Sequence, residues 1–154
     1  MFKLSSELTF PWPVKVIEPN PEKPGELVEH TFTVMFAFID PEVSKASASK
    51  RREITDRLSD AASKAVEIDQ ADLKVAHDAA EEIRKIQDEL RDHDRDALFS
   101  VLRGFETDFM DGNGKPIPFN RKSFDMVYAH DRVRNGLVAA YAEAVSGDKA
   151  RLGN

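Results

Sequence analysis

The sequence contains no cysteine among its 154 residues. This absence excludes disulfide bonds, thiolate metal sites and cysteine nucleophiles together. No stretch approaches the roughly 20 consecutive apolar residues of a membrane-spanning helix. The first residues also lack the apolar run of a secretory signal. We therefore expect a soluble intracellular protein with no membrane partner.

The sequence also has fewer basic than acidic residues. The chain has 22 lysine and arginine residues against 28 aspartate and glutamate residues, which gives a formal net charge of −6. An acidic chain has no global attraction to phosphate backbones, so we expect no nucleic-acid partner. The one obvious basic cluster, Lys50 to Arg52, favours a solvated helix face over a nucleic-acid contact.

Proline and glycine are both absent between Glu42 and Arg103. So long a stretch of helix-forming residues predicts helix. The chain therefore divides into an N-terminal β-hairpin region (1–41), a charged helical middle (42–97) and a C-terminal helical module with a glycine turn (98–154). We expect all three in one domain. The predicted fold class is mainly α with an N-terminal β-hairpin, an α+β fold with a helical core.

Two segments before the helical middle alternate apolar and other residues with period two, which predicts two strands. The apolar sets are Leu8, Phe10, Trp12, Val14 and Val16, and then Phe32, Val34, Phe36 and Phe38. A proline-rich loop separates them, so we expect a hairpin with a long connection. Pro11 and Pro13 lie two residues apart, and both missing N–H donors can face one outer edge. The first strand is thus predicted to be an edge strand.

The helical middle carries two sparse apolar stripes. They consist of Ile54, Leu58, Ala61, Ala65 and Ile68, and of Leu73, Ala76, Ala80, Ile83 and Leu90 with Gln87 as an interruption. One helix of this length is improbable in so small a domain, so we expect a break near 67–69. The two helices should form an antiparallel pair or pack on a neighbouring subunit. The charge-dense run 88–96 should be exposed, and Gly104 should end the apolar helix that follows it.

The motifs that suggest chemistry favour structural interpretations. Asp108, Asp111, Gly112 and Asn113 suggest a calcium loop, but neither register supplies the ligands of an EF-hand, so a hairpin turn is favoured. The four histidines, His30, His77, His93 and His130, include no pair at i, i+4 spacing. Gly112 and Gly114 do not form a nucleotide-binding fingerprint. With no nucleophile motif either, the sequence predicts no enzyme, cofactor or metal site.

Aromatic residues are concentrated in the predicted hairpin. A core face packed on the helices is the favoured interpretation, and the alternative is an exposed patch that captures a partner protein. Trp12, between two prolines, is the best candidate for exposure, and aromatic anchors dominate interface energies. The candidate partner-binding residues are Phe10, Trp12, Phe36, Phe105 and Phe109.

The last third of the chain shows a characteristic order of features. An apolar helix leads to Gly104-Phe105, and a glycine turn (111–114) and the step Pro118-Phe119 follow. Asn120 and Asp131 can each cap a helix. The last helix carries the stripe Val133, Leu137, Ala140, Tyr141 and Ala144, contains Ala-Tyr-Ala-Glu-Ala at 140–144, and should end at Gly147, before a terminal Gly153-Asn154.

This order resembles the tail assembly chaperones of long-tailed bacteriophages, the lambda tail protein G-like family. Phe105 stands where tryptophan is common in that family, and the charged middle is longer. The resemblance implies a non-enzymatic protein that binds the tape measure protein, recruits tail tube subunits and leaves before the tail is complete. It further implies a homo-oligomer in the host cell cytoplasm that is absent from the mature virion.

Two other functions remain open at this point. The hairpin and helices could instead build a ring interface in a structural tail-completion or connector subunit of the virion. An enzyme or metal-dependent regulator centred on His93 and the neighbouring aspartates is the second alternative, and only the local charge density supports it.

Overall fold

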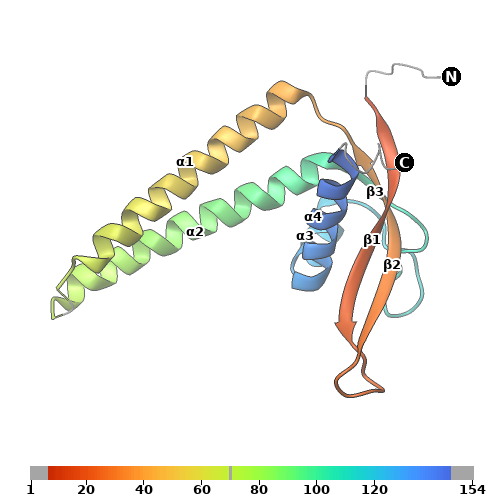
Figure 1. The fold of residues 1–154 in the computed structure, drawn as a ribbon, viewed down its shortest axis with the longest axis horizontal. Helices are drawn as coiled ribbons and strands as arrows, with labels where there is room; N and C mark the ends of the chain where they lie inside the picture. Colours follow the sequence, from red (N-terminus) through yellow and green to blue (C-terminus); the bar gives the residue numbers. More distant parts are fainter. Residues whose placement is uncertain (1–6, 70, 147–154) are drawn as a thin grey trace. The chain divides into compact units, whose positions relative to one another are not determined.

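The computed structural model describes residues 7–69 and 71–146. Strands and helices follow in the order β1 (Thr9–Pro19), β2 (Leu27–Ala37), α1 (Pro41–Val66), α2 (Leu73–Val101), β3 (Leu102–Phe105), α3 (Arg121–Tyr128) and α4 (Asp131–Val145) (Figure 1). The predicted α+β class, mainly helical with an N-terminal hairpin, is confirmed. The predicted helix end at Gly147 and the terminal Gly153-Asn154 lie outside the described residues.

The chain forms two compact units. Residues up to Phe38 combine with those from Leu98 onward into one unit, here called the sheet unit. Residues Ile39–Ala97 form the other, here called the helical hairpin. Most of the buried apolar side chains belong to the sheet unit, which has the larger core.

The sheet is antiparallel with strand order β1-β2-β3, so β1 is an edge strand as predicted. The register pairs Phe10 with Phe36 and Val14 with Phe32. Alternate side chains therefore share one face, which explains the period-two pattern. Its members are Phe10, Trp12, Val14 and Val16 from β1 and Phe32, Val34 and Phe36 from β2.

Helix α4 packs against β1 at a glycine. A Cβ atom added at Gly136 would lie only 2.6 Å from the carbonyl oxygen of Lys15 and 3.2 Å from Cγ1 of Val14. The absence of a side chain thus lets the helix backbone approach the strand backbone closely. Leu137 and Ala140 on the same helix are buried in the core.

The prediction that Gly104 ends the apolar helix is wrong. Helix α2 ends at Val101, and Gly104 lies in β3, opposite Met35 of β2. Pairing with β2 takes over the backbone groups of Leu102 to Phe105, so a tertiary contact overrides the local helix signal. Strand β3 ends at Phe105, so residues 106–109 belong to no named strand.

The break in the helical middle is confirmed, because α1 ends at Val66 and α2 begins at Leu73. The Asp72 carboxylate accepts a hydrogen bond from the backbone N–H of Val75 at 3.2 Å and so caps α2. The two helices form an antiparallel pair, which was one of the two predicted arrangements. Ion pairs from Arg51 to Asp94 and from Arg57 to Glu89 connect them.

The predicted α2 stripe is partly wrong: Ile83 and Leu90 pack on the core as expected, whereas Leu73 and Ala80 are exposed. Leu73 is 80% exposed, whereas Ile86, which the prediction omitted, is 6% exposed. Ile86 forms the small core of the hairpin with Ile54 and Ala61, and Leu58, Ile83 and Leu90 pack around it. The inward residues follow the alternating three- and four-residue spacing of a coiled coil, and the prediction used the same spacing but placed Ala80 and Gln87 inward where the structure has Ala79 and Ile86.

The charged run 88–96 is less exposed than predicted. The side chains of His93, Asp94 and Arg95 are all only partly exposed. Asp94 faces α1 because it pairs with Arg51, which draws this turn toward the neighbouring helix.

We predict that Gly136→Ala destabilises the sheet unit by about 1–3 kcal/mol, because the new methyl group meets a backbone carbonyl that cannot give way. This loss would exceed the roughly 1 kcal/mol that alanine gains over glycine in a helix. Urea unfolding measures it. Gly112→Ala is the matched control, since its Cβ would meet nothing within 4 Å. An unchanged midpoint for Gly136→Ala would contradict the close approach.

Candidate functional site

The structure separates the five candidate partner-binding residues into two aromatic groups. Phe10, Trp12 and Phe36 belong to a group on β1, β2 and α4, here called the hairpin cluster. In it Phe10 lies 6.3 Å from Trp12 and 6.1 Å from Phe36, measured between ring centroids, and Tyr141 lies 5.2 Å from Phe36. Phe36 is completely buried, so it offers no surface to a partner. Phe10 and Trp12 are half-buried.

Phe105 and Phe109 belong to the second group, which we call the aromatic chain. It starts on β2, where Phe32 stacks on Phe109 with ring centroids 4.0 Å apart, and Phe105 then contacts Phe109 at 5.0 Å. It continues into the C-terminal module through Phe119, Phe99, Phe124 and Tyr128, with neighbouring rings 5.0–5.7 Å apart. Offset and edge contacts of this kind each add about 0.5–1.5 kcal/mol beyond burial. The aromatic chain therefore fixes the glycine-turn segment and α3 to the sheet.

Two side chains of the hairpin cluster are polar at one end. Trp12 Nε1 is buried and has no hydrogen-bond partner among the described residues. Burial raises the pKa of the Tyr141 hydroxyl, and the charge of Arg103 acts in the opposite direction. Sequence analysis missed Tyr141 as a cluster member, although its place on the last apolar stripe was recognised.

The edges of the sheet carry two polar contacts that the sequence did not predict. The carboxylate of Asp108 accepts hydrogen bonds from the Thr33 backbone N–H at 3.0 Å and from the Thr33 hydroxyl at 2.9 Å. On the opposite edge, Arg132 donates to the carbonyl oxygen of Ile17 at 2.6 Å. Asp108 thus binds the edge of a strand from within a turn. The hairpin turn that the sequence favours over a calcium loop is also present, since the Gly114 N–H donates to the Asp111 carbonyl oxygen at 3.0 Å and Met110 forms a bridge with Pro116.

A polar group on the helical hairpin has the order of a hydrolase triad. Ser47 Oγ lies 3.4 Å from His93 Nε2, and His93 Nδ1 lies 3.4 Å from Asp94 Oδ1. Both distances are at the limit of hydrogen bonding. Asp94 Oδ1 already accepts a 2.9 Å hydrogen bond from Arg51, and this contact with Asp94 raises the pKa of Arg51. The geometry is that of a polar contact between two helices.

The ion pair between Arg57 and Glu89, the second one between α1 and α2, is bidentate. Arg57 donates to both carboxylate oxygens of Glu89, at 3.0 and 2.8 Å. These hydrogen bonds lower the pKa of Glu89 and raise that of Arg57. Because both side chains are well exposed, solvent screens the pair and its stabilising effect is small.

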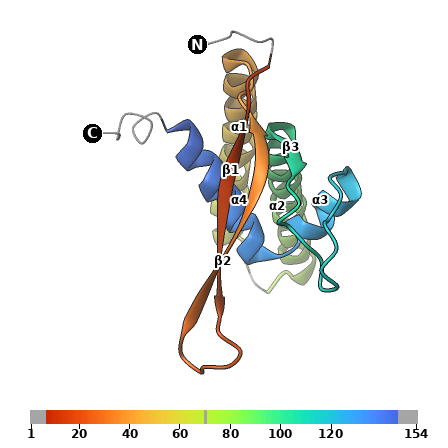
Figure 2. The same cartoon turned by 90° about the vertical axis from the view of Figure 1, so that its right-hand side faces the viewer.

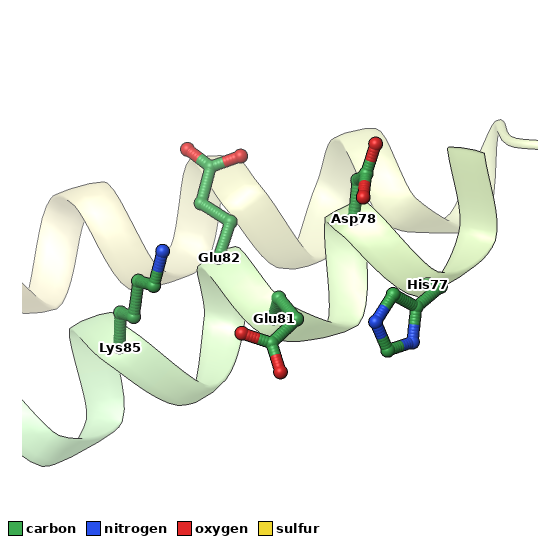
Figure 3. A pocket seen from close by; sticks show the side chains of 5 residues that line it. All are labelled: His77, Asp78, Glu81, Glu82 and Lys85. Atoms are coloured by element: carbon green, nitrogen blue, oxygen red, sulfur yellow. The ribbon is translucent and has the colours of Figure 1, made fainter. Parts of the chain in front are cut away.

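A shallow surface depression lies along α2 and is lined by His77, Asp78, Glu81, Glu82 and Lys85. Figure 3 shows that these side chains leave the helix in different directions and do not converge on one point. Within the ranges 7–69 and 71–146, no group of three His, Cys, Asp or Glu side chains is placed to hold a metal ion. The arrangement is typical of a solvated helix face.

Comparison with known proteins identifies no relative: no family model, curated protein or solved structure matches this chain. Among the described helices, none is both long enough and apolar enough to cross a bilayer. The candidate sites are therefore the surfaces of the sheet unit and of the helical hairpin.

We predict that Asp108→Ala lowers the free energy of unfolding by about 1–3 kcal/mol, because it leaves the Thr33 N–H and hydroxyl without their acceptor. Thermal unfolding followed by circular dichroism measures the loss. Glu106→Ala is the control, since Glu106 contributes its backbone N–H to Thr33 and not its carboxylate. Equal stability of the two variants would show that the Asp108 contact contributes nothing.

Proposed function

We propose that this protein is a non-enzymatic phage tail assembly chaperone that binds the tape measure protein and recruits tail tube subunits. The observation that carries the proposal is the order of features from Leu98 onward, which resembles that family. The aromatic chain supports it, because six of its seven rings, all except that of Phe32, belong to this segment. The segment is thereby held together as a structural module.

The helical hairpin offers a surface suited to an apolar helical cargo. Near the turn between its helices, Val66 is 86% and Leu73 is 80% exposed. We call these two residues the hairpin tip. Large apolar side chains on a surface favour contact with another protein. The thin core of Ile54, Ala61 and Ile86 also favours support from a partner or from another copy, which agrees with a homo-oligomer.

The proposed protein acts in the host cell cytoplasm and is absent from the mature virion. A structural tail-completion or connector subunit is the second candidate. The end of the β1-β2 hairpin that projects beyond α4 and β3 in Figures 1 and 2 favours it, since a projecting hairpin can reach a neighbouring subunit in a ring. Mass spectrometry of purified virions separates the two, because a connector remains in the particle and a chaperone does not.

We predict that this protein, produced together with the tape measure protein of its own phage, keeps that protein soluble and co-elutes with it in size-exclusion chromatography. Val66→Ser combined with Leu73→Ser should weaken the complex by about tenfold or more, since two apolar anchors are lost. Glu67→Ser combined with Lys74→Ser changes neighbouring exposed polar residues and is the matched control. No complex with either the tape measure or the tube protein would overturn the proposal.

A further inference from the structure

The backbone groups at the edges of the sheet are unevenly protected. On the outer edge of β1, three alternate positions are proline and lack an N–H group, namely Pro11, Pro13 and Pro19. Between them, the carbonyl oxygen of Ile17 accepts from Arg132, and that of Lys15 lies against Gly136 of α4. The missing N–H groups and the contacts with α4 therefore interrupt this edge, so it is poorly suited to a regular ladder with another strand.

On the other side of the sheet, β3 covers only part of β2. The ladder between them pairs Val34 to Phe36 of β2 with residues 102–105 of β3. One step farther, the Thr33 carbonyl oxygen accepts from the backbone N–H of Glu106 at 3.0 Å, and the Thr33 N–H donates to Asp108. Coverage of this edge ends at Thr33.

The orientation of the Thr33 backbone N–H and C=O groups fixes the orientation of the backbone groups in the residues that precede it on β2. Both of its backbone groups point away from β1, and in an antiparallel ladder every second residue faces the same edge. Thr31, Glu29 and Leu27 therefore direct their N–H and C=O groups outward as well. In the part of the chain that the structure describes, no residue pairs with these outward-facing groups, although β1 pairs with the other edge of the same stretch. We call Leu27–Thr31 the open edge; the views in Figures 1 and 2 agree that this end of the hairpin projects beyond α4 and β3.

The charges around the open edge select the occupant. The distal hairpin, residues 15–31, carries the four carboxylates Glu18, Glu22, Glu26 and Glu29 against two lysines. Lys15 pairs with Glu29 and Lys23 with Glu26, each at 3.6 Å, and His30 lies 3.7 Å from Glu18. With four carboxylates and two lysines, the stretch keeps a net negative charge even though Glu29 has one basic neighbour. A basic strand is therefore favoured. Antiparallel pairing of two copies centred on Glu29 would set like charges opposite each other, which is destabilising.

We infer that the open edge binds an extended, basic segment of a partner protein by strand addition, with lysine or arginine beside Glu29 and apolar side chains beside Val28 and Phe32. Backbone hydrogen bonds to Glu29 and Thr31 hold the segment, and the alternating side chains select it. The inference rests on the sheet edge and goes beyond the proposed function, since neither the family resemblance nor the hairpin tip, which lies between α1 and α2, indicates a site for strand addition.

The test uses the full chain and the capped hexapeptide (Lys-Val)3, followed by NMR titration of the Glu29 and Thr31 amides. In an antiparallel addition the lysine N–H groups face β2. Backbone N-methylation of the lysines should therefore abolish binding, whereas N-methylation of the valines should leave it within about twofold. The acidic peptide (Glu-Val)3 should bind at least about tenfold more weakly. Equal binding of all four peptides, or no binding of (Lys-Val)3, would overturn the inference.

A matched pair of variants tests the position of the site. Glu29 and Ile17 lie opposite each other on one rung of the hairpin and face opposite edges. Glu29→Pro removes an N–H group from the open edge and should weaken (Lys-Val)3 at least about tenfold. Ile17→Pro removes one from the β1 edge and should leave the affinity within about twofold. Equal effects of the two substitutions on the affinity for (Lys-Val)3 would overturn the inference. A free protein that dimerises, and whose dimerisation Glu29→Pro abolishes, would also overturn it, because a second copy would then be the occupant. The N-methylated peptides decide the matter should either variant fail to fold.

Discussion

The backbone hydrogen bonding of β2 is the constraint on which the sheet unit depends. A strand must satisfy the N–H and C=O groups along both of its edges wherever water is excluded. Strand β1 covers one edge of β2 along its whole length, whereas β3, Glu106 and Asp108 cover the other edge only as far as Thr33. The side chains of β2 extend this central role, since Phe36 belongs to the hairpin cluster and Phe32 begins the aromatic chain.

Local sequence patterns predicted much of the architecture. The period-two alternation and the outward prolines identified the hairpin and its edge strand, and the break in the helical middle lies where the length of that segment led us to expect it. Features fixed by tertiary pairing escaped the prediction. Leu102 and Gly104 carry no local sign that β2 will draw them into a strand, and Asp108 carries none that its partner is Thr33, 75 residues away. Part of the α2 stripe was predicted wrongly because alanines at adjacent positions, Ala79 and Ala80, do not show which one faces inward.

The candidate site was predicted only in outline. The aromatic residues that suggested a partner-binding patch divide between two clusters that hold the sheet unit together, and Phe36 is fully buried. The hairpin tip and the open edge contain no phenylalanine, tryptophan or tyrosine. Aromatic content alone could not distinguish core from interface, because both environments favour large rings. Burial and hydrogen-bond direction distinguish them.

Native-state hydrogen exchange along β2 of the free chain tests the central claim most directly. The amides of His30 and Phe32, which face β1, should exchange slowly, and the amide of Thr33 should be protected by Asp108. The amides of Glu29 and Thr31 should exchange nearly as fast as those of an unstructured peptide. Uniform protection from residue 27 to residue 33 would contradict the account, because it would show that this edge of the strand is already paired.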